Sequence, residues 1–188
     1  MRHLIFYILF CAPMFCSAQT KHGALNELKL SDFKFESIFG STQSDTNAIY
    51  CLLGSGFFRT SHSEDADKLI ENWIDNHKEA IVVPVSSFGP VITDIEDSKM
   101  VYCWVIQGAD TLNTYLVRYG AYPGGTMVRP HIGTEKEKNS KSRKEGLLIS
   151  ENEYNDFIEK IKISELYARE HRLGIWKDYE DLDKSDND

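Results

Sequence analysis

The sequence predicts an α+β fold in which helices cover one small, curved β-sheet. Short runs of β-branched and aromatic residues have the length of strands, and segments with apolar residues at helical spacing lie between and after them. The order is strand pair, helix, two strands, short helix and long helix, with no internal repeat. With 188 residues, 41% of them hydrophobic, the chain can bury one sizeable core. We therefore expect one compact domain.

Residues 1–18 have the pattern of a cleavable signal peptide. A basic start precedes an apolar run from Leu4 to Phe15, and Cys16-Ser17-Ala18 then supplies a cleavage point after Ala18. The run is about a dozen residues long, whereas a helix needs about 20 to cross a bilayer, so we expect no transmembrane span. Lipid attachment at Cys16 is the alternative, which the bulky Phe15 before it disfavours. We predict an exported protein, periplasmic or secreted.

The next segment predicts a lead-in, a strand pair and a first helix. Residues 19–45 are mostly polar and are expected to be irregular. Residues 48–53 and 57–60 are apolar runs around a Gly-Ser-Gly turn, which predicts two short strands. Ser61 followed by Glu64 has the spacing of a capping box. Apolar residues behind it recur at helical spacing and predict a helix over about residues 63–77.

Two further strands and a short helix follow. Residues 81–85 and 101–106 are apolar runs rich in β-branched residues, and an acidic connection that contains Gly-Pro separates them. Residues 113–119 predict a short helix. Gly120 suits the left-handed position that often follows a helix end.

The last predicted element is a long helix. It begins at Ser150, whose capping box closes on Glu153, and it continues as a helical apolar stripe until Gly174 stops it. The tail, residues 177–188, is acidic and is expected to be unstructured.

The charge of the chain limits its partners. It has 29 acidic and 21 basic residues, a formal net charge of −8. An acidic surface repels phosphate backbones, so single-stranded nucleic acid is a weak candidate partner. One basic cluster lies between Lys136 and Lys144, but Glu137 interrupts it and Glu135 and Glu145 flank it, and such mixed charge is typical of a solvated loop.

Two cysteines lie beyond the signal segment, Cys51 and Cys103, each in a predicted strand. In an exported protein two such residues can form a disulfide. The alternative is two buried, unpaired thiols, and the sequence leaves both open. No Cys or His pattern has the spacing of a structural zinc site.

Two motifs resemble staphylococcal-nuclease-like (thermonuclease) domains. Asn113–Ala121 has the pattern N..LVR.G.A, and Ala168–Trp176 has the pattern A+...LGIW, in the family's order. The match is good over residues 100–176 and extends back to about residue 57. The resemblance implies an OB-like small β-barrel with flanking helices over residues 46–176, and we expect a monomer.

In active members of this family the resemblance implies calcium-dependent hydrolysis of DNA and RNA phosphodiesters. That reaction needs carboxylates for calcium, an acid to activate water and two arginines to neutralise developing charge. Here Arg59 is the candidate first arginine, and Lys99 is the cation nearest to the place of the second. Glu64 and Asp65 are the candidate catalytic acids. Asp45 and Asp65 are the candidate calcium ligands.

Departures from the family pattern predict weakened chemistry. The family's Asp-Gly-Asp-Thr is reduced to Asp45-Thr46, and Lys99 offers a point charge in place of a bidentate fork. Losing one such contact costs about 100- to 1,000-fold in rate. We therefore predict lost or much-modified phosphodiesterase activity and a role as a binding or structural module. The alternatives are an active, divergent calcium-dependent nuclease and an unrelated small α+β envelope protein.

Overall fold

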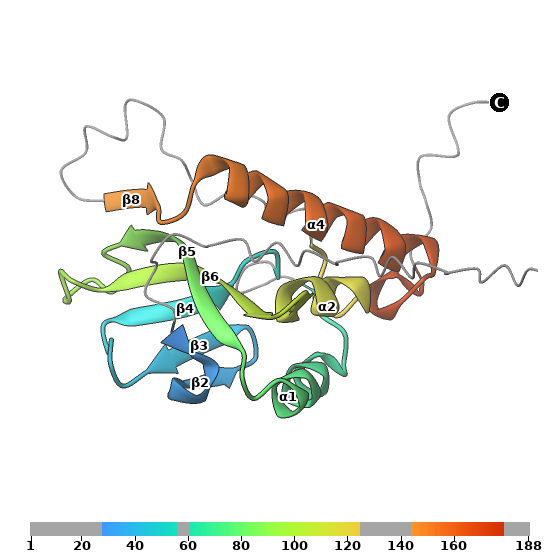
Figure 1. Cartoon of the computed structure of the whole chain (residues 1–188), viewed down its shortest axis with the longest axis horizontal. Coiled ribbons are helices and arrows are strands. Elements are labelled where there is room, and N and C mark those ends of the chain that lie inside the picture. Colours follow the sequence, from blue (N-terminus) through green and yellow to red (C-terminus); the bar gives the residue numbers. More distant parts are fainter. Residues whose placement is uncertain (1–27, 56–60, 125–143, 179–188) are drawn as a thin grey trace, which may run out of the picture.

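A computed structural model describes residues 28–55, 61–124 and 144–178. Within these ranges the chain forms a mixed α+β fold with a curled, half-barrel sheet and three α-helices (Figure 1). This confirms the predicted α+β fold class with one curved sheet and flanking helices, and the curl of the sheet is compatible with an OB-like barrel. The signal segment, the predicted strand 57–60, the basic loop's side chains and most of the acidic tail lie outside the described residues.

Six strands form the path of the sheet, in the order β1-β5-β6-β4-β3-β2. Their bounds are β1 Leu28–Lys29, β2 Phe33–Glu36, β3 Phe39–Thr42, β4 Ala48–Leu52, β5 Ile81–Gly89 and β6 Lys99–Gln107. Two short strands extend it: β7 (Asp110–Thr111) pairs with β6, and β8 (Lys144–Leu147) pairs with β5. Strands β4 and β6 are parallel, and the other pairs are antiparallel.

The two ends of the sheet are consecutive in the chain. Only the 3₁₀ turn Leu30–Asp32 separates β1 from β2, which lie at opposite ends of the strand order. This short connection brings the edges toward each other and curls the sheet. The expectation of an irregular lead-in is therefore wrong over residues 28–42. Alternation of half-buried and exposed residues along β2, with Phe33 and Phe35 on one face, is typical of a strand with one solvated face.

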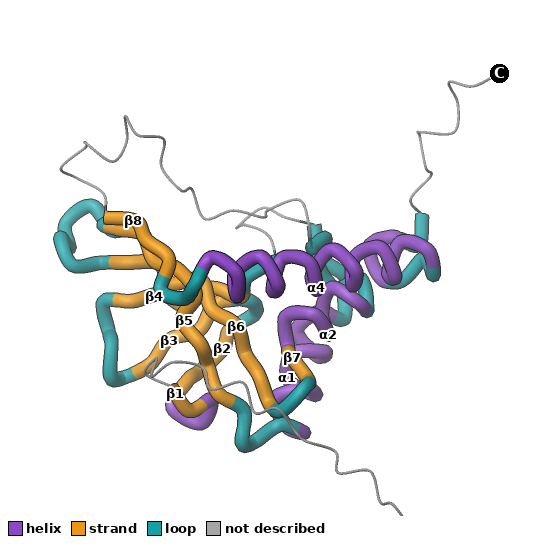
Figure 2. Tube along the Cα trace, turned by 45° about the horizontal axis from the view of Figure 1, so that its top comes forward, coloured by secondary structure: helices purple, strands orange, loops and turns teal. Residues whose placement is uncertain are grey.

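Helices cover both faces of the sheet (Figures 1 and 2). Helices α1 (Ala66–Asn76) and α2 (Leu112–Arg118) pack with the sheet around one buried cluster that contains Trp73. Helix α4 (Glu151–Glu170) packs on β5 and β6 over a second cluster, in which Trp104 stacks on Phe157 at 4.3 Å. All three tryptophans, Trp73, Trp104 and Trp176, are buried. None of the helices in the described ranges is both long and apolar enough to cross a bilayer.

Two of the four predicted helix ends, the start of α4 and the end of α2, are present at the predicted residues. The Ser150 and Glu153 capping box is present at the start of α4. Helix α2 ends with Gly120 in the left-handed conformation, and helix α4 ends two residues before Arg172, which takes the same conformation. Both ends carry the paired hydrogen bonds of a Schellman motif. Gly174 is therefore not the stop of α4, although its φ is also positive.

The predicted capping box at the start of α1 is wrong. Asp65 is the N-cap residue, and its side chain makes no capping bond. Its Oδ1 instead accepts a hydrogen bond from the Ser63 hydroxyl at 2.6 Å. The backbone N–H of Ala66 donates to the Ser63 carbonyl, so the helix begins with a tight turn that replaces the box.

The two cysteines are unpaired and buried, which settles the alternative that the sequence left open. Cys51 lies in β4 and Cys103 in the neighbouring parallel strand β6. Burial raises the pKa of Cys51 to about 12, and it raises the pKa of Cys103 well above its ordinary value. Buried thiols with raised pKa values are poor nucleophiles at neutral pH.

We expect Cys51 and Cys103 to resist iodoacetamide in the native protein at neutral pH and to react fully in denaturant, as peptide mass spectrometry would show. The same shifts predict alkaline instability. A thiol whose pKa is raised by folding stabilises the native state fully below its unfolded pKa near 9, and this contribution is lost as pH rises toward 12. Rapid labelling of the native protein, or equal stability at pH 8 and 11, would contradict this.

Candidate functional site

Asp45 and Lys99 pair with each other. Asp45 lies in the turn between β3 and β4, and Lys99 opens β6. The parallel register sets Lys99 opposite Ala48, and its backbone N–H donates to the Asn47 carbonyl at 2.9 Å. The Lys99 Nζ then reaches Asp45 Oδ2 at 2.7 Å, with both side chains partly exposed. The candidate calcium ligand and the candidate phosphate-binding cation thus satisfy each other's charge.

Glu64 and Asp65 lie at the start of α1. The Asp65 carboxylate is bonded to the Ser63 hydroxyl, and Glu64 is exposed. The backbone N–H of Ser63 donates to the Ala121 carbonyl at 3.0 Å, which ties this corner to the chain that follows α2. Asp65 is the N-cap residue and Glu64 precedes it, and acids close to a helix N-terminus are favoured by the helix dipole, so their position has a structural reason of its own.

The two acidic candidates for calcium do not converge. Asp45 lies at the turn that joins β3 to β4, whereas the start of α1 lies at the other end of that hairpin (Figure 1). Tyr122, next to Ala121, contacts Ser37 at this other end. Strand β4 between them spans roughly 16 Å for its five residues. Since calcium binds oxygens at about 2.3 to 2.6 Å, Asp45 and Asp65 cannot share one ion in this arrangement.

The described ranges hold no cluster of metal ligands and do not include the candidate first arginine. Across residues 28–55, 61–124 and 144–178, no three His, Cys, Asp or Glu side chains are grouped so as to hold a metal ion. Arg59, the candidate first arginine, lies outside the described residues, as does most of the basic loop. The chemistry of the described part therefore depends on Asp45, Glu64, Asp65 and Lys99.

A polar contact that the sequence did not indicate lies beside α1. Ser37, in the two-residue turn between β2 and β3, has a φ of 56°. Its hydroxyl is 3.0 Å from the Tyr122 hydroxyl, and the His62 ring stacks on Tyr122 at 6.0 Å. Burial raises the pKa of Tyr122, so the phenol stays neutral. This group can form hydrogen bonds but supplies no carboxylate. The contact joins residues far apart in the chain, so no local pattern could have found it.

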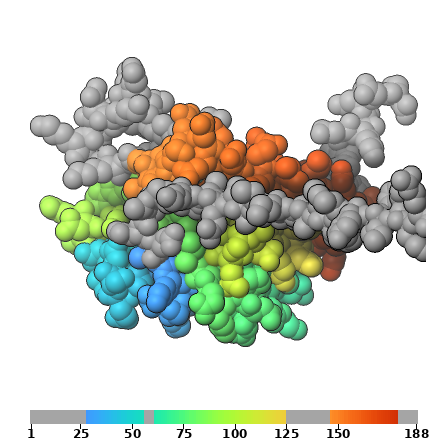
Figure 3. All heavy atoms as spheres, in the orientation of Figure 1, coloured from blue at the N-terminus to red at the C-terminus, as the bar shows by residue number. Residues whose placement is uncertain are grey.

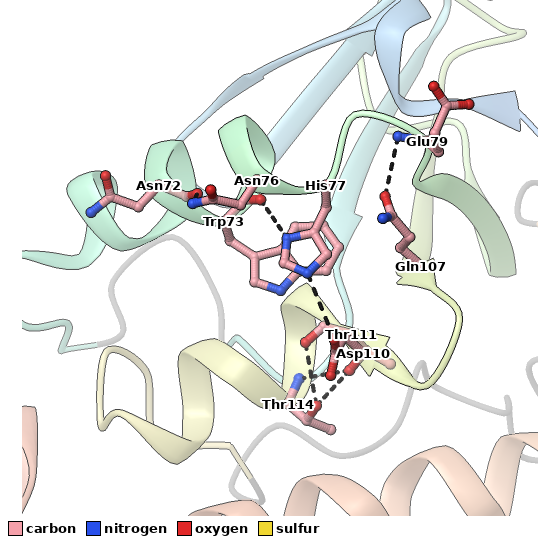
Figure 4. A network of polar contacts seen from close by, with 9 residues as sticks. All are labelled: Asn72, Trp73, Asn76, His77, Glu79, Gln107, Asp110, Thr111 and Thr114. Atoms are coloured by element: carbon pink, nitrogen blue, oxygen red, sulfur yellow. Dashed lines mark hydrogen bonds and ion pairs between the residues drawn. The ribbon is translucent and has the colours of Figure 1, made fainter.

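His77 and Asp110 form a histidine–carboxylate pair at the end of α1 (Figure 4). The His77 Nδ1 donates to the Trp73 carbonyl at 2.7 Å, its ring stacks on the Trp73 indole at 3.9 Å, and its Nε2 lies 3.8 Å from Asp110 Oδ2. Next to Asp110, the Thr111 hydroxyl caps α2 by accepting from the Thr114 N–H. Both ring nitrogens face fixed neighbours, so this network fastens α1 to α2.

The motif residues that carry the resemblance also have structural contacts. The Arg118 guanidinium lies 3.7 Å over the Tyr167 ring, which braces α2 against α4. Asn113 is buried and bridges β4 and β6 through three hydrogen bonds. Gly120 and Gly174 meet directly, and the Gly120 carbonyl accepts from the Ile175 N–H. Both motifs therefore act at the junction of α2, α4 and the sheet.

Comparison with known proteins assigns no family to this arrangement. Neither a scan against protein-family models nor a search of curated proteins found a match.

Proposed function

We propose that this chain is an exported, divergent staphylococcal-nuclease-like protein that keeps an OB-like scaffold and has lost or greatly modified phosphodiesterase chemistry. It acts as a binding or structural module. The observation that carries this proposal is the Asp45–Lys99 ion pair, because it joins the acid and the cation that catalysis would need to keep separate.

The scaffold half of the proposal is supported by the curled sheet and by the motif contacts. The neighbouring segments β1 and β2 supply both ends of the strand order, which curls the sheet in the direction that closes a small barrel. The two family-like motifs meet at Gly120 and Gly174, so each has a role that depends on the other.

The chemical half is supported by charge. Calcium binding gains from several uncompensated carboxylates. Phosphate binding gains from a cation whose donors are available. At 2.7 Å each of Asp45 and Lys99 reduces the other's availability, and the acids of α1 lie at the far end of the hairpin. One such contact supplies about 100- to 1,000-fold in reaction rate, so the loss of several contacts lowers the rate far more.

We expect purified protein to leave end-labelled single-stranded DNA and RNA intact in calcium, at the same background rate as in chelator. Gel electrophoresis of the oligonucleotides measures this directly. Lys99→Ala, which frees Asp45, is expected to leave that background unchanged, because the acids at α1 remain too distant to complete a calcium site.

Arg59→Ala serves as the control for the alternative function. Chelator-sensitive cleavage that this substitution abolishes would contradict the proposal and establish a divergent nuclease that uses Arg59 with Glu64 or Asp65. Cleavage that persists in Arg59→Ala and in Lys99→Ala alike would indicate a contaminating enzyme.

A further inference from the structure

The outward face of α4 exposes two aliphatic side chains. Ile163 and Leu166 are 58% and 57% exposed, whereas the opposite stripe of the helix is buried on the sheet. Residues three and four apart are neighbours on a helix surface. Ile163 therefore adjoins both Leu166 and Tyr167, and Tyr167 adjoins His171. We call these four residues, together with Arg118, the α4 strip. In Figure 3 the orange to red atoms of α4 form the upper surface of the described part.

Arg118 is held in one orientation beside these apolar residues. Its guanidinium lies 3.7 Å over the Tyr167 ring, and the His171 ring stacks on Tyr167 at 4.0 Å. A ring has two faces, so partners this close to its centre lie on opposite sides, and Tyr167 is held between them. Arg118 makes no ion pair or hydrogen bond with any other described residue, and its side chain is exposed. Its N–H donors are therefore available.

The arginines of the described part of the chain are gathered at this end of the molecule. The arginines of the described ranges are Arg118, Arg169 and Arg172, and all three lie in the last turns of α2 and α4 or just after them. Arg169 is bonded to Glu165 at 2.6 and 2.9 Å. The exposed side chains of Arg118 and Arg172 are the ones that can contact a partner. The same turns hold Glu165 and Glu170, so in a chain with a net charge of −8 the arginines give this end a small local excess of positive charge.

We infer that the α4 strip binds an acidic peptide segment that carries apolar side chains beside its carboxylates. This inference rests on the proposed role as a binding module and names its partner. A stacked guanidinium pairs with a carboxylate through two parallel bonds. Ile163 and Leu166 add apolar contact area. Tyrosine and arginine are enriched at protein interfaces.

Nucleic acid fits this surface less well. Single strands are held by stacking on free aromatic faces and by broad positive charge. Both faces of Tyr167 are already occupied, and the chain as a whole is acidic. Aliphatic side chains such as Leu166 provide no stacking surface.

The acids beside the strip set a further condition. Glu159 lies 3.6 Å from Lys162, which offsets its charge. Glu170 is exposed and stands four residues after Leu166, so it opposes an acidic partner. Removing the charge of Glu170 should therefore strengthen binding.

The test selects binders from a random displayed peptide library with the purified chain as bait, and it measures the affinity of a selected peptide by fluorescence anisotropy. We expect selected peptides to combine Asp or Glu with Leu, Ile or Phe. Arg118→Ala and Leu166→Ser should each weaken binding about tenfold or more. Glu170→Gln should tighten it.

Matched controls separate binding from folding. Lys68→Ala removes an exposed cation from α1, and Leu148→Ser removes an exposed leucine before α4, so neither should change the affinity. Circular dichroism reports whether each variant is folded. Leu166→Ser alters only a solvated side chain and keeps the test valid if Arg118→Ala loosens α2.

Three results would overturn the inference. The first is a selection that yields no acidic, apolar peptides. The second is a peptide affinity that Leu166→Ser and Arg118→Ala leave unchanged. Binding of a single-stranded oligonucleotide that these variants abolish, in place of peptide binding, would also refute it. The cleavage assay reports separately on the proposed function, because nuclease activity would refute the inactive module without changing the peptide affinity.

Discussion

Replacing Gly120 with alanine is expected to lower the free energy of unfolding by about 3 kcal/mol or more. Gly120 has a φ of 68°, and a methyl group there would overlap the backbone carbonyl of Leu173. The left-handed conformation alone disfavours a side chain by about 1 to 2 kcal/mol. The overlap adds a further cost, because a backbone carbonyl cannot turn away as a flexible side chain can.

The neighbours of Gly120 are fixed on both sides. The Leu173 N–H donates to the Ala168 carbonyl in the terminal motif of α4, and the Ile175 N–H donates to the Gly120 carbonyl at 2.9 Å. Moving Leu173 to accept a methyl group would strain both bonds. Gly174→Ala is expected to be as severe, since its added methyl group would overlap the Gly120 carbonyl.

Gly108 provides a matched control. Its φ is 61°, but a methyl group there would meet no atom within 4 Å. Gly108→Ala should therefore cost only the conformational part, about 1 kcal/mol. Denaturant unfolding followed by tryptophan fluorescence gives all three values. If Gly120→Ala cost no more than Gly108→Ala, the close approach of the two helix ends would be disproved.

Helix ends were predictable where the whole signal is local. The Ser150 capping box and the left-handed Gly120 each depend on a few consecutive residues, and both are present. At the start of α1 two local signals competed. Ser63 bonds to Asp65, so Ser61 and Glu64 do not form the box that their spacing suggested. Spacing alone cannot decide between neighbouring capping residues.

The strands before residue 45 were missed for a different reason. Along β2 the half-buried phenylalanines alternate with Lys34 and Glu36, and the sequence shows this alternation. A run of four residues is nevertheless too short to distinguish a strand from a loop without its partner. The partner is β3, which supplies the pairing at every position from Phe33↔Thr42 to Glu36↔Phe39. Sheet formation here is a property of the pair.

The candidate site shows the same limit more sharply. Residue types identified Asp45 and Lys99 as possible participants in catalysis, but their pairing depends on the register of β4 and β6. Parallel strands are joined by a long connection, and no feature within either strand fixes that register. Sequence reasoning could name the charged groups. It could not tell that two of them neutralise each other.

Asn113→Asp is expected to be the other severe substitution, at about 3 kcal/mol or more near neutral pH. The Asn113 Oδ1 accepts from the Val105 N–H at 2.9 Å, and its Nδ2 donates to the carbonyls of Leu53 and Cys103 at 2.8 and 3.1 Å. The side chain is buried, and both the oxygen and the nitrogen of its amide form hydrogen bonds. A carboxylate has nearly the same shape but no donor. It would place a buried negative charge against two carbonyl oxygens.

The pH dependence of this variant gives a second readout. Burial beside two acceptors raises the pKa of the introduced carboxyl above its unfolded value, so stability is lost as pH rises and recovers as pH falls. The protonated acid can donate to one of the two carbonyls, which makes the recovery partial. Asn155→Asp is the control, because this amide is exposed on α4 and its change should stay within about 0.5 kcal/mol. Equal unfolding midpoints for the two variants would show that Asn113 does not join the sheet to α2.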